Sequence, residues 1–208
     1  MIIIKIIDLS HLLKTKIPTY PEDPQLNIKD ISPQDNSYKI SLLKTGTHSG
    51  THIDAPQHYI KNSKNINEIK LENLIGKTTV LKTNTHKKEI KIKHINNMSE
   101  KFEKIIILKT NWWENWENPN YFKQNTYPSK ELTKYLIKKG IKGIAIDSPS
   151  IDSPNSDKNH KILLKNNIWI VENLTKTNQL KNNKYQHAYF IPLKIETEAS
   201  PIRAFIIE

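Results

Sequence analysis

The chain has 208 residues, of which 36% are hydrophobic, with no cysteine and a net charge of +11. This length fits a single domain, residues 1–208, that can bury a core and still leave a cleft. The lack of cysteine excludes disulfides and thiolate metal sites, so any metal must be held by His, Asp or Glu. The N-terminal run MIIIKIIDLS is interrupted by Lys5 and Asp8, is too short for a membrane span and lacks a signal-peptide cleavage region. We therefore expect a cytoplasmic protein.

The positive charge does not by itself indicate a nucleic-acid or membrane partner. Arg203 is the only arginine among the 32 basic residues, and the lysines are scattered along the whole chain. Arginine is the preferred side chain for reading phosphates and bases. We therefore expect solvated lysines and neither of these partners, and salt-dependent binding of nucleic acid would contradict this interpretation.

In the first half of the chain, apolar runs predict strands at residues 2–7, 38–46, 77–83 and 104–110. The segment after the first strand, 8–24, contains three prolines and is expected to be a loop.

The second half alternates helices and strands. Residues 129–140 are expected to form a helix with Ser129 as its N-cap and Gly140 just past its end. A second helix is expected near 157–167, and strands at 143–147, 168–172, 188–196 and 200–207. Strands outnumber helices and helices join some of them, which predicts an α/β fold with a mixed sheet and flanking helices.

The segment HSGTHIDAPQH, residues 48–58, holds three of the eight histidines of the chain. His48, His52 and Asp54 offer two neutral nitrogens and one carboxylate, a set typical of catalytic zinc or manganese sites. In a flat strand, however, the Cα atoms of His48 and His52 would lie roughly 13 Å apart. The chain must therefore bend between them, and Gly50 permits such a bend. The interpretation is a strand ending in a sharp metal-binding loop, and spacing alone leaves an ordinary polar loop equally open.

Two distant residues favour the metal site. His160 shares a face of the second predicted helix with Leu163 and Leu164. Glu172 ends a predicted strand on the same face as Ile170, where a carboxylate is costly unless it is paired or binds a metal. Each residue alone is weak evidence, since a lone histidine on a core-facing stripe is more often structural.

Ordered motifs along nearly the whole chain resemble those of the metal-dependent cyclase family, which includes bacterial kynurenine formamidases (arylformamidases). They are DLSHLLKTKIPTYPEDP, HSGTHIDAPQH, LKTNWWENW, GIAIDSPSID, LLKNNIWIVENL and SPIRAF. Glu22, Asn111 and Ala199 stand where glycine is common in the family. None of them belongs to the metal motif, but the resemblance does not predict the shape of the substrate pocket.

The resemblance implies a swivelling β/β/α fold, a homodimer and one or two divalent ions per chain, Zn²⁺ ahead of Mn²⁺. It implies that His48, His52 and Asp54 bind a first ion, and that Asp54 bridges to a second ion held by His160 and Glu172. His58 matches the catalytic histidine of the family.

The implied reaction is the hydrolysis of an amide such as an N-formyl aryl amine by metal-activated water. A histidine suits the protonation of the leaving amine, and we expect His58 in that role, with a structural role as the alternative. Glu172 is expected to be ligand, base or both. Tyr20, Trp112 and Trp113 are candidates for the walls of an aromatic substrate site, although such residues are more often core.

Two alternatives stay open at this point. One is a related hydrolase that opens a cyclic amide or a lactone-like ring with the same metal chemistry. The other is a non-catalytic, metal-dependent small-molecule binding protein, against which His58 argues because binding alone needs no proton carrier.

Overall fold

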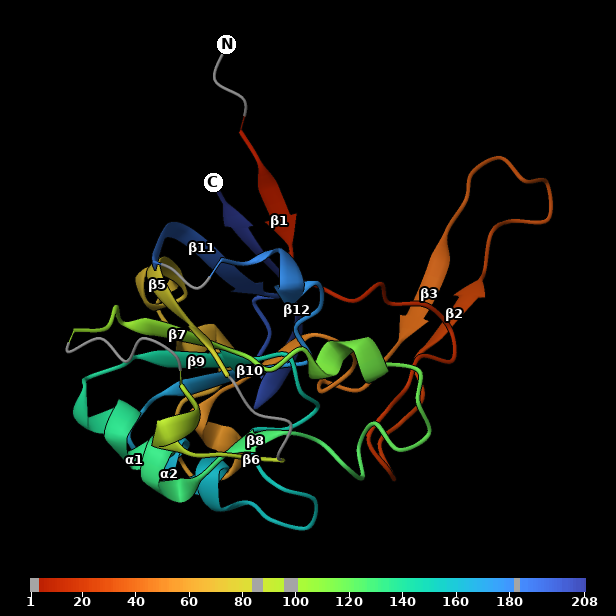
Figure 1. Ribbon diagram of the computed structural model, residues 1–208. Coiled ribbons are helices and arrows are strands. Elements are labelled where there is room, and N and C mark those ends of the chain that lie inside the picture. The colour runs from red at the N-terminus through yellow and green to blue at the C-terminus, as the bar shows by residue number, and fades with distance from the viewer. Residues whose placement is uncertain (1–3, 84–87, 96–100, 182–183) are drawn as a thin grey trace.

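The computed structural model describes residues 4–83, 88–95, 101–181 and 184–208 (Figure 1). The strands of its main sheet are β1 (Ile6–Asp8), β4 (His52–Asp54), β5 (Ile75–Lys82), β7 (Ile105–Lys109), β9 (Gly143–Ile146), β10 (Trp169–Glu172), β11 (Lys184–Pro192) and β12 (Ala199–Ile207). They run in the order β1-β12-β11-β5-β7-β9-β10-β4, and a further pairing of β12 with β4 closes the strands other than β1 into a barrel. β5, β7, β9 and β10 are parallel, and the remaining pairings are antiparallel.

Among the described residues, two smaller sheets and two α-helices lie outside the barrel. β2 (Asn27–Asp30) and β3 (Ser41–Lys44) form a hairpin that projects from the body of the molecule (Figure 1), here called the arm, residues 27–44. β6 (Glu89–Ile90) pairs with β8 (Tyr127–Pro128). The helices are α1 (Lys130–Lys138) and α2 (Lys158–Lys165), and short 3₁₀ turns include η1 (Pro56–His58), η5 (Trp112–Asn115) and η6 (Thr177–Gln179).

The parallel strands are buried on both faces, which explains their nearly continuous apolar sequences. Within β7, Ile105 and Ile107 point into the barrel, where they join the interior core with Val171 and Phe190. Ile106 and Leu108 point outward into a second core. The outer core also contains leucines of both helices, which therefore cover this side of the barrel: Leu132, Leu136, Leu163 and Leu164.

The α/β class and most of the expected elements are confirmed. The side chain of Ser129 accepts a hydrogen bond from Leu132 N, and Gly140 follows α1 with a φ of 78°. The first strand begins at Ile6, and residues 2 and 3 of its expected range lie outside the described residues. The swivelling β/β/α description and the single domain stay predictions.

One expectation about the histidine-rich segment is wrong. Residues 52–54 are not part of a loop but form β4, a fully buried strand. It was missed because it has only three residues, two of which are polar.

No helix among the described residues is long and apolar enough to cross a membrane.

Candidate metal centre

Strand pairing in the barrel brings together the polar residues of β4 and β10. Ile53 belongs to the interior core, so its neighbours His52 and Asp54 face outward, because side chains alternate along a strand. β10 pairs antiparallel with β4 in a register that sets Glu172 opposite His52. Three polar side chains thus share one buried patch on the outer face of the barrel, 3% exposed or less for His52 and Asp54 and 5% for Glu172.

Helix α2 adds His160 to this patch. Leu163 and Leu164 anchor the helix in the outer core, and His160 lies one turn earlier on the same side. The carboxylate of Asp152 accepts hydrogen bonds from the backbone N–H groups of Asn159 and His160, at 2.8 and 3.0 Å, and so caps the first turn of α2.

The expected bend at Gly50 is confirmed. Gly50 has a φ of 63°, and a Cβ atom placed on it would lie 2.6 Å from Leu13 Cδ2. Its carbonyl oxygen accepts hydrogen bonds from the side chain of Asn173 at 3.1 Å and, at 2.9 Å, from Nδ1 of His52. The bend carries His48 back over the patch, with its Nδ1 3.0 Å from Asp54 Oδ1.

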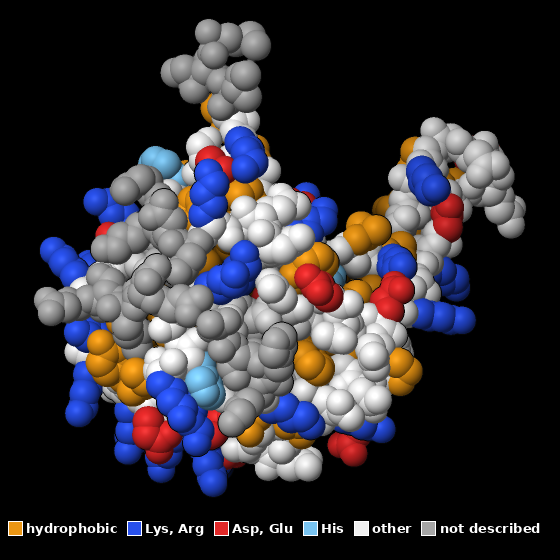
Figure 2. Space-filling view, in the orientation of Figure 1, with side chains coloured by type: hydrophobic (Ala, Val, Ile, Leu, Met, Phe, Trp, Pro, Cys, Tyr) orange, Lys and Arg blue, Asp and Glu red, His pale blue; other side chains and the backbone are white. Residues whose placement is uncertain are grey.

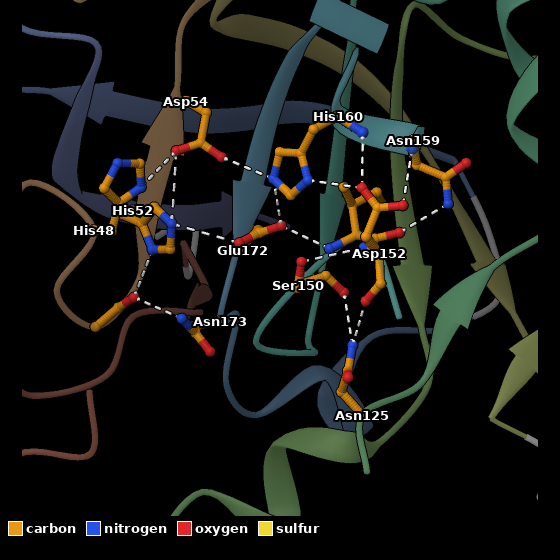
Figure 3. A network of polar contacts seen from close by, with 12 residues as sticks. His48, His52, Asp54, Asn125, Ser150, Asp152, Asn159, His160, Glu172 and Asn173 are labelled. Atoms are coloured by element: carbon orange, nitrogen blue, oxygen red, sulfur yellow. Dashed lines mark hydrogen bonds and ion pairs between the residues drawn. The ribbon is translucent and has the colours of Figure 1, made fainter. Parts of the chain in front are cut away.

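The five residues expected to hold metal therefore meet at one place (Figure 3). His52 Nε2 lies 3.6 Å from Asp54 Oδ1 and 3.6 Å from Glu172 Oε2. His160 Nε2 lies 3.5 Å from Asp54 Oδ2 and 3.1 Å from Glu172 Oε1. Asp54 thus faces three imidazoles and Glu172 faces two, and each carboxylate uses both of its oxygens. The assignment of these residues as ligands stays a prediction.

The residues present fit a divalent ion. Both carboxylate oxygens of Asp54 are buried and accept no hydrogen bond from the described residues, which would be costly if nothing else neutralised them. Two ligand atoms on a tetrahedral zinc ion with bonds of 2.0–2.1 Å are separated by about 3.4 Å. The nitrogen–oxygen distances around Asp54 and Glu172 range from 3.0 to 3.6 Å, close to this separation.

Contacts at Nδ1 fix the orientation of the imidazoles of His160 and His52. His160 Nδ1 lies 2.9 Å from Asp152 Oδ2, and His52 Nδ1 contacts the carbonyl oxygen of Gly50. With a proton on Nδ1, each neutral ring has its free lone pair on Nε2, the nitrogen that faces the two carboxylates. Acceptors on the outer nitrogen are typical of histidines that ligate metals.

The pKa shifts of the residues at the centre show that its carboxylates favour positive charge on their neighbours. Burial alone would lower the pKa of His48, but Asp54 and Glu198 raise it to about 10. Burial also opposes a charged His160, yet Glu172 and Asp152 raise its pKa well above the usual value. For Glu172, burial raises the pKa, but His160 and His52 lower it to about 2. Buried carboxylates therefore stay ionised and attract cations, a role that protons or a metal ion can fill.

His58 lies at the edge of the same group, at the end of η1. Its ring centroid is 4.4 Å from that of His48 and 5.7 Å from that of His160. Burial lowers the pKa of His58 to about 4, so that its ring is neutral near pH 7. One of its nitrogens also lies within 4.8 Å of ligand atoms of His48 and Asp54, which is close enough for a ligand as well as for a proton carrier.

A cavity of about 250 Å³ opens beside the candidate metal centre. His48, His52, His58, His160 and Glu172 line one part of it, and Tyr20, Tyr59 and Phe122 provide aromatic walls. Tyr20 therefore lies where an aromatic substrate site was expected.

Trp112 and Trp113 do not line this cavity. Trp112 instead donates from Nε1 to the carbonyl oxygen of Tyr121, and its ring stacks on the ring of Tyr121. The expected contact of Trp112 and Trp113 with substrate therefore has no support in this arrangement. Tyr59 and Phe122 line the cavity instead.

Three polar residues at the centre were not singled out from the sequence as site residues. Asp152 orients His160, Asn173 supports the bend at Gly50, and Glu198 lies 3.3 Å from His48 Nε2. Asn173 follows Glu172 directly and Asp152 ends the GIAIDSPSID motif, so both had a local signal. Glu198 had no local signal, because its contact with His48 depends on the pairing of β12 with β4.

Two of the positions where glycine is common in the family have positive φ angles. Glu22 has a φ of 76° and Asn111 a φ of 62°. Glycine adopts such angles without steric cost, which explains the usual preference for it at these places. At both positions a positive φ is adopted here by a residue with a side chain, and Glu22 adjoins Asp23, which lines the cavity.

A family model described as "Putative cyclase" matches residues 7–153 of the chain. The chain belongs to this cyclase family. It is also similar along its length to curated kynurenine formamidases, including the one of Bacillus thuringiensis subsp. konkukian (strain 97-27). The identity to that relative is 27%, covering 96% of each chain.

Solved structures share the fold of this cyclase-family protein. Isatin hydrolase A from Labrenzia aggregata has a TM-score of 0.84 and 21% identity, covering 98% of this chain and 93% of the other. A predicted metal-dependent hydrolase from Bacillus stearothermophilus has a TM-score of 0.83 and 23% identity, covering 99% of each chain.

Proposed function

We propose that this cyclase-family protein is a metal-dependent amidohydrolase that cleaves an N-formyl aryl amine, with N-formylkynurenine as the preferred substrate. The observation that carries the proposal is the buried carboxylate of Asp54, which accepts no hydrogen bond within the described part of the chain and faces three imidazoles beside a cavity. The hydrolase class also agrees with the names of the curated relatives and of the solved structures.

The proposed ligands form two groups that share Asp54. His48 and His52 would hold a first ion with Asp54, and His160 and Glu172 a second. Imidazole and carboxylate ligands suit Zn²⁺ first and Mn²⁺ second. A bound divalent ion supplies Lewis acidity and makes hydroxide available near neutral pH.

The remaining chemistry falls to the side chains around the ions. His58, neutral near pH 7, is placed to accept a proton from the attacking water and to deliver one to the nitrogen of the leaving amine. Glu172 is held by a hydrogen bond of 2.6 Å from the backbone N–H of Ile151 to its Oε1. This contact favours Glu172 as a fixed ligand over a mobile base.

The shape of the cavity supports an aromatic substrate. The rings of Tyr20 and Phe122 meet edge to face with centroids 5.7 Å apart, and the ring of Tyr59 lies 5.2 Å from that of His160. An aryl group between these rings would place its amide beside the proposed metal ions, since the same cavity borders His160 and Glu172.

We also propose a homodimer, supported by the arm. All four residues of each arm strand are exposed, among them Ile28, Leu42 and Leu43. Figure 2 shows hydrophobic side chains along this projection. A two-stranded hairpin is marginally stable alone in water, so a second copy of the chain is the proposed cover.

The proposal is tested by measuring the hydrolysis of N-formylkynurenine by metal-loaded protein, with isatin as a cyclic amide for comparison. We expect turnover of the formamide, at a kcat/KM at least tenfold above that for the cyclic amide. Faster opening of isatin would replace the formamidase by the ring-opening alternative. Metal binding without turnover of either compound would favour the small-molecule binding protein.

A further inference from the structure

Glu198 directly precedes β12, the strand that closes the barrel, and its carboxylate approaches the metal centre. Ala199, the first residue of β12, pairs with Asp54, and the backbone N–H of Ala55 donates to the carbonyl oxygen of Glu198 at 2.8 Å. The backbone at Glu198 is therefore fixed beside β4. The position of its side chain follows from barrel closure and not from a free surface loop.

Two donors converge on one oxygen of Glu198. Thr47 Oγ1 donates to Glu198 Oε1 at 2.6 Å, and His48 Nε2 lies 3.3 Å from the same oxygen. His48 is thus held between two carboxylates, with Nδ1 on Asp54 and Nε2 on Glu198. A neutral imidazole has one N–H and one lone pair, so an acceptor on Nε2 places the lone pair on Nδ1.

This arrangement is the reverse of that at the other two histidines. His52 and His160 have their acceptors on Nδ1 and turn Nε2 toward Asp54 and Glu172. We propose that Glu198 is a positioning residue that makes His48 a metal ligand through Nδ1. The inference rests on the proposed metal centre and assigns Glu198 a role in it without direct contact with the ion.

The test compares Glu198→Ala and Glu198→Gln with the wild type, and Glu196→Gln serves as control. Glu196 is an exposed carboxylate two residues earlier in the chain. Affinity for Zn²⁺ is measured by competition with a chromophoric chelator. The ¹⁵N shifts of the His48 ring in the zinc-loaded protein report which nitrogen carries the metal. Thermal unfolding of the metal-free variants reveals any loss of fold.

We expect Glu198→Ala to weaken binding about 10- to 100-fold, as is typical when a partner of a ligating histidine is removed. Glu198→Gln keeps an acceptor for Nε2–H and should lose less than about tenfold on the same scale. Glu196→Gln should match the wild type. The wild-type ring should show the metal on Nδ1 and a proton on Nε2.

Three results would overturn the inference. Zinc affinity of Glu198→Ala within about twofold of the wild type, or metal on Nε2 of His48, would remove the positioning role. Loss of one bound ion in both Glu198 variants, as complete as in His48→Ala, would make Glu198 a ligand instead. If any of these results is found while the wild type binds zinc and hydrolyses the formamide, only the role proposed for Glu198 is overturned. A wild type that binds no zinc would overturn the proposed function as well.

Discussion

At the scale of single residues, neighbouring histidines of similar sequence context have different surroundings. His48 and His52 each have one nitrogen on a fixed acceptor and the other toward Asp54. His58 differs because burial lowers its pKa to about 4, whereas the carboxylates of Asp54 and Glu198 raise the pKa of His48 to about 10. This difference supports two ligands and one proton carrier in a segment of eleven residues, as the family resemblance implies.

His58→Ala should lower kcat about 10²- to 10⁴-fold, the contribution of a positioned general acid or base. Bound metal should stay at the wild-type amount, because His58 is not among the proposed ligands. Steady-state kinetics and elemental analysis of the same preparation measure both quantities. His187→Ala, which changes an exposed histidine on β11, is the control and should leave both unchanged. Loss of metal in His58→Ala would show that His58 is a ligand.

Gly50→Ala should lower the free energy of unfolding by about 2–5 kcal/mol. The positive φ costs a residue with a Cβ atom about 1–2 kcal/mol, and crowding against Leu13 adds about 1–3 kcal/mol. Urea denaturation measures the change. Leu13→Ala in the same chain should recover part of the crowding cost. Equal stability of Gly50→Ala and the wild type would contradict the bend described for this segment.

At the scale of elements, the sequence predicted those elements whose local signals agree with their environment. The apolar run at 104–110 became the doubly buried β7, and Ser129 and Gly140 marked both ends of α1. β4 was missed because its two outward side chains serve the site and not a core. The contact of Glu198 with His48 could not be predicted, since it needs a pairing between strands about 145 residues apart along the chain.

Asp152→Ala should destabilise the protein by about 2–4 kcal/mol, because two backbone N–H groups of the first turn lose their acceptor. It should also weaken metal binding, since His160 Nδ1 loses its partner. Asp157→Ala on the same helix is the matched control, because the side chain of Asp157 makes no capping hydrogen bond. Thermal unfolding and chelator competition measure the two effects. An equal loss of stability in both variants would contradict the capping role of Asp152.

At the scale of the whole molecule, barrel closure assembles the centre from distant parts of the chain. β10, β4 and the start of β12 lie side by side in the closed barrel, and α2 packs against β10. The arm extends away from this assembly (Figure 1). The only arginine, Arg203, forms an ion pair with Asp8 at 2.6 Å on the neighbouring β1, so its guanidinium supports the sheet. The high positive charge thus comes from lysines.

The arm should determine the oligomeric state. Replacing both Leu42 and Leu43 by lysine should convert a dimer into a monomer, because charged side chains would replace exposed apolar ones in the proposed interface. Analytical ultracentrifugation measures the mass of each form. Lys29→Glu, a change at an exposed charged position of the same hairpin, is the comparison for charge alone. A wild type that sediments as a monomer would contradict the proposed dimer.

We propose that the reaction requires divalent metal held by five residues: His48, His52, Asp54, His160 and Glu172. The most direct measurement is the rate of N-formylkynurenine hydrolysis as Zn²⁺ is added back to chelated protein in steps, with bound zinc determined at each step. We predict no turnover without metal, a rate that rises with bound zinc up to two ions per chain, and no recovery in Asp54→Asn. Undiminished hydrolysis by metal-free protein would show that the reaction does not require these ligands or their metal.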